Sequence, residues 1–169
     1  MLSKAVIRTP WSPLSVIARD GVVVQSWFGP DPLVDLDIDG PVKAARTIPG
    51  ICDAVQAWID GELDAITRVA VDQPGSAFHQ DVWRAMRTIP AGDPWTYGTL
   101  AARAGRPRAA RAAGTACGMS AVAPFVACHR VVRSNGVGEY GYGVTLKIAL
   151  LEHEAAADPI IGSENRGRR

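Results

Sequence analysis

The stretch Thr96–Gly118, "TYGTLAARAGRPRAARAAGTACG", combines two short helical patterns with a turn signal between them. Thr96 has the residue type of a helix N-cap, and Gly105 can end a first helix. Pro107 suits the first turn of a second helix, and Gly118 suits the position past its end. Two short helices joined by a tight turn predict a helix-turn-helix.

Small residues cover most of the second helix, which we expect over residues 107–118. Its long side chains are Arg108 and Arg111, and its small ones are Ala109, Ala110, Ala112, Ala113, Gly114 and Ala116. One interpretation is close packing on another helix, since Ala and Gly let helix axes approach. The other is a helix laid against DNA with Arg111 projecting. A smooth face fits the narrow minor groove better than the major groove, where several polar side chains must reach base edges.

Helical patterns flank this stretch on both sides. Ser76 is a suitable N-cap for a helix whose buried stripe comprises Phe78, Val82, Trp83 and Met86. Towards the other end, residues 145–156 predict an amphipathic helix that buries Leu146, Leu150 and Leu151. The segment between them holds a turn signal, "SNG", and a Gly-rich connector, "VGEYGYG".

Residues 1–75 have the pattern of a small β-rich unit with one helix. Apolar runs at 4–9 and 14–28 predict strands, and Asp20-Gly21 inside the second run is a hairpin signal. A loop rich in Pro, Asp and Gly follows at 29–41. Residues 48–63 then predict a helix that ends near Gly61 and whose apolar face comprises Ile51, Val55, Trp58 and Ile59. Residues 68–75 predict one further strand.

Pro74-Gly75 interrupts the chain, and we expect a domain boundary there. The expected division is an N-terminal domain at 1–75, a C-terminal domain at 76–157 and a flexible tail at 158–169. The fold class is then mixed α/β, with a small sheet-plus-helix domain followed by a mostly helical one.

Composition narrows the function classes. The 169 residues suffice for one large domain or two small ones. No run is as long as a membrane span, and no signal-peptide pattern opens the chain. Cys52, Cys117 and Cys128 are odd in number and form no CxxC, which argues against a disulfide scaffold or a zinc ribbon. Reduced thiols favour a cytoplasmic protein.

Charge is unevenly distributed along the chain. Residues 1–75 carry 6 Lys and Arg against 10 Asp and Glu, whereas residues 76–154 carry 9 against 5. An acidic front and a basic back suggest two regions with different partners. Ordinary variation of a polar surface is the competing interpretation.

The segment Phe125–Val132, "FVACHRVV", places a cysteine, a histidine and an arginine inside an apolar run that we expect to be extended. A thiol with a pKa of ~8.5 needs a base to act as a nucleophile near neutral pH. Neighbours on a strand point to opposite faces, so His129 could reach Cys128 only through a turn or a water molecule. Glu152 and Glu154 are candidates to orient the imidazole. An inert buried cysteine and a papain-like hydrolase remain open at this point.

Four collinear motifs carry a family resemblance. They are "SAFHQDVWRAMRTIPAGDPWTYG" (76–98), "YGTLAARAGRPRAARAAG" (97–114), "ACHRVVRSNG" (127–136) and "LLEHE" (150–154). Together they resemble the O6-alkylguanine-DNA alkyltransferases, and "TPWSPLSVIARDGVVVQSWF" (9–28) fits the family's first domain more loosely. The resemblance implies a ribonuclease-H-like N-terminal domain and a C-terminal domain with a winged-helix-like helix-turn-helix.

The implied activity is direct DNA repair. The resemblance implies that the protein binds duplex DNA through the minor groove, flips out O6-alkylguanine and transfers the alkyl group irreversibly to Cys128, once per molecule. O4-alkylthymine remains an open second substrate. His129, acting through a water, would take the thiol proton, Glu154 would hold the imidazole, and Tyr97 would protonate the departing guanine. The family needs no metal or organic cofactor for this transfer.

The resemblance also implies roles around the nucleophile. Arg111 aligns with the arginine that replaces the flipped base, and Tyr97 with the tyrosine that crowds a phosphate. The other implied DNA contacts are Thr96, Ala110, Gly114 and Arg130, and the implied base pocket comprises Ser120, Val131, Tyr140, Gly141 and Tyr142. A monomer without membrane contacts is implied, with cooperative assembly on DNA as the open alternative.

The match departs from the family at identifiable positions. The connector at 137–143 resembles the family's pocket lid. Ala127 replaces a proline, Ser120 an asparagine and Tyr142 a glycine of this lid, and the lid is one residue shorter between Asn135 and Tyr140. The zinc ligands of some members' first domain have no counterpart, so we expect no metal. These departures support one rival, a non-catalytic module that binds alkylated DNA. A helix-turn-helix transcription regulator is a second rival, although it leaves His129 and Glu154 without roles.

Overall fold

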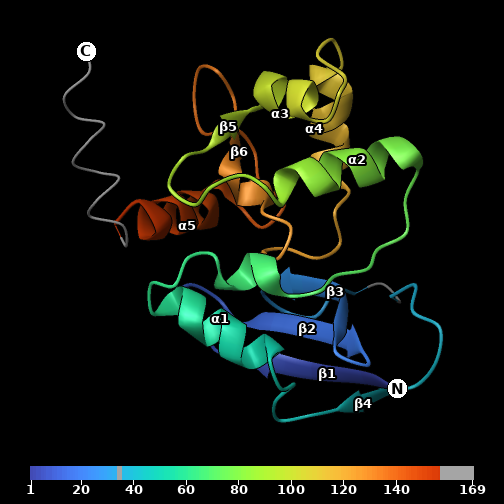
Figure 1. Ribbon diagram of the computed structural model, residues 1–169. Helices are drawn as coiled ribbons and strands as arrows, with labels where there is room; N and C mark the ends of the chain where they lie inside the picture. Colours follow the sequence, from blue (N-terminus) through green and yellow to red (C-terminus); the bar gives the residue numbers. More distant parts are fainter. Residues whose placement is uncertain (34–35, 157–169) are drawn as a thin grey trace.

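A computed structural model describes residues 1–33 and 36–156 of the chain. Residues 1–59 build a four-stranded sheet with a helix beside it, and most of the remaining helices lie in the other half of the molecule (Figure 1). The expected flexible tail at 158–169 lies outside the described residues.

The sheet has the strand order β3-β2-β1-β4. Its strands are β1 (Leu2–Ile7), β2 (Leu14–Arg19), β3 (Val22–Phe28) and β4 (Val42–Ala44). The β2–β3 hairpin turns at Asp20 and Gly21, both of which have positive φ (50° and 86°), as a tight hairpin turn requires. The predicted hairpin is therefore confirmed. Strand β4 pairs parallel with β1 and was missed, because three exposed residues are too short to show an alternating pattern.

Helix α1 (Ile51–Ile59) packs beside the sheet as predicted. It buries Ile51, Val55 and Trp58, and Gly61 follows its end with a φ of 107°. The strand predicted at 68–75 is wrong. A short 3-10 helix, η1 (Ala65–Arg68), comes first, and only Val71 then pairs, through one isolated bridge to Val23 of β3. Pro74 has no N–H to continue such a ladder.

The helix-turn-helix elements lie close to their predicted places. Helix α2 (Ala77–Met86) begins where the Ser76 hydroxyl accepts from the His79 N–H (3.2 Å). Helix α3 (Tyr97–Arg103) packs on α4 (Ala110–Gly118). Helix α4 begins three residues later than predicted, because residues 107–108 form a turn closed by the Ala109 N–H donating to the Arg106 carbonyl (2.9 Å).

The last part of the chain differs most from expectation. The segment predicted to be extended is instead irregular up to a 3-10 turn, η2 (Cys128–Arg130), and only Val131–Val132 form a strand, β6. This strand pairs parallel with β5 (Trp95–Thr96). Helix α5 (Val144–Ala156) follows the predicted connector. Its buried face is Lys147, Leu150 and Glu154, whereas Leu146 and Leu151 are half-buried.

One hydrophobic core runs through both halves. It includes Trp58 of α1, Met86 of α2, Leu150 of α5, and Phe125 from the segment before η2. The edge strand β3 also bonds to the helical half, since the Ser26 N–H donates to the Ala121 carbonyl (2.8 Å). The expected boundary at Pro74-Gly75 lies in a segment without helix or strand, and the division into two domains stays a proposal. Among the described residues, no helix has the length and apolar character needed to cross a membrane.

Candidate active site

The 3-10 turn η2 gives Cys128 a different exposure from that of the two residues that follow it. Cys128 is partly exposed, whereas His129 is fully buried and Arg130 is only 2% exposed. The turn is closed by the Arg130 N–H donating to the Ala127 carbonyl (3.0 Å). Ala127 has a φ of −82°, close to the value that proline would impose, so the missing proline has not opened the turn. Of the two arrangements proposed for adjacent Cys and His, the turn is confirmed.

The thiol of Cys128 lies against the end of α4. Its Sγ donates to the carbonyl of Cys117 at 3.2 Å. A hydrogen bond with the Cys117 thiol, followed by burial, raises the pKa of Cys128 well above its usual value. A thiol held in this way stays protonated near neutral pH, so its reaction as a nucleophile requires a base.

The imidazole of His129 is held by a buried carboxylate. Its Nε2 lies 3.0 Å from Oε1 of Glu154, and both side chains are fully buried. Burial by itself would raise the pKa of Glu154, but His129 and Arg130 outweigh it and lower this pKa to about 2. An ionised Glu154 calls for the proton on Nε2, which leaves Nδ1 as the proton acceptor. Nδ1 is buried and makes no hydrogen bond within the described residues. Of the two carboxylates considered, Glu152 is exposed.

Arg130 belongs to this buried network and not to a DNA-facing surface. Its Nη2 lies 2.7 Å from Oε1 of Glu154, and its Nη1 donates to the Ile89 carbonyl (2.9 Å). We therefore correct its assignment as a DNA contact: a guanidinium neutralised by a buried carboxylate cannot also reach a phosphate. The apolar flanks of Arg130 in the sequence were the signal for this burial.

Trp58 also binds the carboxylate, and sequence reasoning missed this role. Its Nε1 donates to Oε1 of Glu154 at 3.2 Å across the two halves of the molecule. The apolar pattern of α1 predicted that Trp58 is buried, but periodicity does not show where an indole N–H points. Tryptophan buried in a core usually finds such a partner.

Tyrosines line the neighbourhood of the thiol. The rings of Tyr140 and Tyr142 lie 5.3 Å apart, and that of Tyr142 lies 5.7 Å from Phe28. The Tyr140 hydroxyl is buried without a hydrogen-bond partner among the described residues. Burial, followed by the charge of Cys128, raises the pKa of both tyrosines, that of Tyr142 to about 12. Both therefore keep their protons and can act as hydrogen-bond donors.

The other predicted pocket residues differ in exposure. Ser120 is half-buried, Gly141 is exposed and Val131 is fully buried. The carbonyl of Val131 accepts from Nζ of Lys147 (2.6 Å), which also donates to the Glu139 carbonyl (2.9 Å). Lys147 thus ties the lid to β6. Sequence reasoning missed this lysine, although the spacing of Lys147, Leu150 and Glu154 matches one helix face.

The predicted DNA contacts on α3 and α4 lie together. Thr96 caps α3 by accepting from the Thr99 N–H (3.1 Å). The ring of Tyr97 packs on Gly114, where an added Cβ would come within 3.3 Å of the ring. Arg111 is exposed and Ala110 is half-buried on the same helix. Arg111 thus projects from an exposed side of α4 that otherwise carries small residues.

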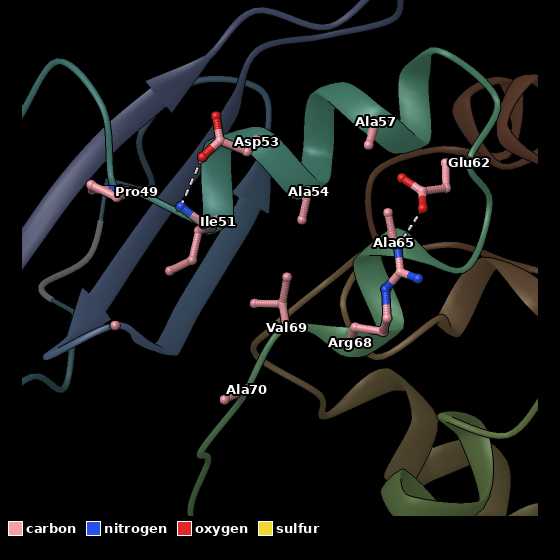
Figure 2. A pocket seen from close by; sticks show the side chains of 12 residues that line it. Pro49, Ile51, Asp53, Ala54, Ala57, Glu62, Ala65, Arg68, Val69 and Ala70 are labelled. Carbon is pink, nitrogen blue, oxygen red and sulfur yellow. Dashed lines mark hydrogen bonds and ion pairs between the residues drawn. The ribbon is translucent and has the colours of Figure 1, made fainter.

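Other features lie away from this site. A groove of about 500 Å³ in the N-terminal half, lined by residues such as Ile51, Glu62 and Arg68, includes none of the predicted site residues (Figure 2). Within the described residues, no three His, Cys, Asp or Glu side chains come together in a way that could hold a metal ion.

Comparisons with known proteins place these features in a family. Residues 77–156 match the model described as "6-O-methylguanine DNA methyltransferase, DNA binding domain". A methylated-DNA--protein-cysteine methyltransferase of Shigella flexneri is 36% identical over 158 residues, which cover 88% of this chain and 92% of that protein.

Solved structures of methyltransferases from this family have the same fold as this chain. The O6-methylguanine methyltransferase of Mycobacterium tuberculosis matches with a TM-score of 0.78 and 32% identity, over 95% of this chain and 96% of that one. The structure of Mycobacterium tuberculosis OGT in complex with DNA matches with a TM-score of 0.79 and 33% identity, over 94% and 96%. The mixed α/β fold class is confirmed, and the chain belongs to the methylated-DNA--protein-cysteine methyltransferase family.

Proposed function

We propose that this protein repairs DNA by transferring the alkyl group of O6-alkylguanine to Cys128. The observation that carries the assignment to Cys128 is the η2 turn, which leaves this thiol partly exposed while His129 is held against the buried Glu154. The fold and the family support the reaction class, and the geometry supports the residue roles.

Binding precedes chemistry. Helices α3 and α4 would lie in the minor groove, with Arg111 filling the stack as the damaged nucleotide turns out. Thr96 and Tyr97, at the start of α3, would contact the backbone beside the flipped nucleotide. The base then enters between the lid and Cys128, where the hydroxyl of Tyr140 is free to bond to it.

The transfer is a single displacement. The thiol proton leaves for Nδ1 of His129 through a water molecule, and the thiolate attacks the alkyl carbon. One S–C bond forms as the C–O6 bond breaks, and the departing guanine takes a proton at N3 from Tyr97. Burial, and the nearby Cys117, raise the pKa of Tyr97, which keeps this proton in place until it is needed. The thioether is stable, so each molecule acts once.

The substitution Cys128→Ser tests the assignment. A serine hydroxyl is a far weaker nucleophile, so transfer from an O6-methylguanine duplex should be lost while affinity for that duplex stays within about twofold. The matched control is Cys52→Ser on α1, which should transfer normally. An active Cys128→Ser protein would contradict the mechanism.

Two finer assignments rest on the same proposal. The reduced thiols and the DNA substrate favour a cytoplasmic location. Residues 76–157 would form the DNA-binding and catalytic domain, and residues 1–75 would support it through the contact of Trp58 with Glu154.

A further inference from the structure

Gln73 makes an unexpected set of hydrogen bonds next to the candidate site. It lies between η1 and α2 and is only 6% exposed. Its side-chain Oε1 accepts from the Ala121 N–H at 2.8 Å, and its Nε2 lies 3.2 Å from Oγ of Ser120. Its own carbonyl accepts from Gln80 of α2 at 2.7 Å. Hydrogen bonds therefore hold both the side-chain amide and the backbone carbonyl of Gln73.

These contacts fix which way the amide faces. The Ala121 N–H can only donate, so the atom facing it must be the amide oxygen. Nε2 is then the atom facing Ser120 and donates to its hydroxyl oxygen. The reverse bond, from Ser120 to Oε1, is longer (3.4 Å) and therefore the weaker of the two. The hydroxyl of Ser120 therefore accepts from Gln73 and has its own proton left to donate.

Ser120 and Cys128 meet at one atom. The Ser120 N–H and the Cys128 thiol both donate to the carbonyl of Cys117, at 3.3 Å and 3.2 Å. The backbone of Ser120 and the thiol of Cys128 thus lie close together at the end of α4. The Cys117 thiol and burial raise the pKa of Cys128, and a hydrogen bond from Ser120 opposes them.

We propose that Gln73 is a positioning residue for the nucleophile, whose amide orients the Ser120 hydroxyl so that it donates its proton to the sulfur of Cys128. This inference rests on the proposed function and deepens it. As the thiol loses its proton, its bond to the Cys117 carbonyl is lost, and the oriented hydroxyl of Ser120 supplies a donor to the thiolate. A hydrogen bond to a charged acceptor stabilises it by more than a bond to a neutral one.

Other groups also face the thiol and must stay constant in a test. The titratable groups that interact with the charge of Cys128 are Cys117, Lys147, Tyr97, Tyr140 and Tyr142. The variants below change none of them.

The substitution Gln73→Glu separates orientation from packing. A carboxylate keeps the acceptor for the Ala121 N–H but replaces the amide donor, so the Ser120 hydroxyl would donate to Glu and turn its proton away from the sulfur. The measured quantity is the rate at which iodoacetamide labels Cys128, mapped by peptide mass, as a function of pH. The matched control is Gln56→Glu, the same substitution on the exposed surface of α1.

We expect the midpoint of the labelling profile to rise by roughly one pH unit in Gln73→Glu, which slows labelling near neutral pH about tenfold. Ser120→Ala should give a similar rise. In the Ser120→Ala background, Gln73→Glu should add only a small further rise, because the hydroxyl it acts through is gone. The Gln56→Glu profile should match that of the unmodified protein.

Two results would overturn the inference: an unchanged midpoint in Gln73→Glu, or an equal rise with and without Ser120, which would show an effect of charge alone. Melting temperature identifies a variant that does not fold, and Gln73→Met then replaces it, since it removes the donor without adding charge. Labelling needs no DNA, so the test stands even if the protein transfers no methyl group. Failure of the proposed function and failure of this inference are thus distinguishable.

Discussion

At the scale of single residues, the site depends on one carboxylate. Oε1 of Glu154 is shared by His129, Arg130 and Trp58. A buried arginine and a buried carboxylate neutralise each other, and the histidine then gains its orientation from a group that stays ionised. We therefore propose that the pair Arg130–Glu154 serves both stability and catalysis.

The depressed pKa of Glu154 predicts how stability depends on pH. Its pKa falls from 4.5 to about 2 on folding, so the unfolded chain binds protons more readily. The stabilisation is fully present above pH ~4.5 and is lost as the pH falls through ~2; from the shift it amounts to about 3 kcal/mol. In Glu154→Gln this acid-dependent part should disappear, and stability at pH 7 should fall by a few kcal/mol, because Arg130 keeps an unpaired charge.

Urea denaturation between pH 2.5 and 7 measures both effects. Since exposed acids also titrate in this range, the matched control is Glu152→Gln, whose side chain is exposed two residues earlier on α5. The control should keep the pH dependence of the unmodified protein. If Glu154→Gln keeps it as well, the carboxylate is not the buried anion described above.

Trp58 extends the same network into the N-terminal half. Trp58→Phe keeps an aromatic ring but removes the N–H that donates to Glu154. We expect a loss of about 1.5–3 kcal/mol in the free energy of unfolding and a several-fold slower transfer, because a bond to a charged acceptor is lost. The control for aromatic packing is Trp11→Phe, because the ring centroid of Trp11 lies 5.3 Å from that of Trp58. Equal transfer rates in the two variants would contradict a role for the indole N–H.

At the scale of elements, α4 is the part most clearly suited to DNA. Its exposed side carries Arg111 beside small residues, and Gly114 lets the ring of Tyr97 approach. Its opposite side packs on α2 and α3 through Ala113 and Ala116. The packing interpretation of its small residues is therefore confirmed for the buried face, and the DNA-binding interpretation stays a proposal for the exposed face.

Arg111→Ala should separate flipping from chemistry. If Arg111 fills the stack, the variant should lose roughly tenfold or more in the rate of duplex repair but little in its reaction with free O6-benzylguanine. Single-turnover rates on the two substrates are the measurement. Arg108→Ala, which removes an exposed charge from the turn before α4, controls for electrostatic attraction alone. Equal losses on both substrates would refute the role in flipping.

The tyrosines of the lid predict which sizes of alkyl group the protein accepts. Tyr142 packs between Tyr140 and Phe28, and we propose that its ring narrows the approach to Cys128. Tyr142→Gly should raise the rate for benzyl adducts relative to methyl adducts by roughly tenfold, because the ring's volume becomes available. Tyr140→Phe keeps the ring and should leave this ratio near that of the unmodified protein. An unchanged ratio in Tyr142→Gly would argue against a steric lid.

The elements also show what sequence reasoning can reach. Ser76 and Thr96 were predicted as N-caps and accept the expected bonds, because capping is decided by residues three apart in the chain. The segment before Cys128 was predicted to be extended and is not, since its conformation is decided by contacts with α4 and β3. Arg130 was misassigned for the same reason: its partner Glu154 lies on another element, which local patterns do not reveal.

At the scale of the whole molecule, the two halves share one site. The N-terminal half contributes Trp58 to the carboxylate and Gln73 to the serine beside the thiol. The C-terminal half contributes the proposed nucleophile, the proposed base and the surface of α3 and α4. Residues 1–75 are therefore expected to support catalysis without touching the substrate.

The central claim is that Cys128 accepts an alkyl group from DNA. Intact-protein mass spectrometry after incubation with a duplex carrying a single O6-methylguanine tests it most directly. We predict a gain of one methyl group, mapped to Cys128 and never exceeding one per chain. No gain, together with retention of the lesion duplex on a gel, would contradict the claim and identify a lesion-binding module in which the thiol has no acceptor role.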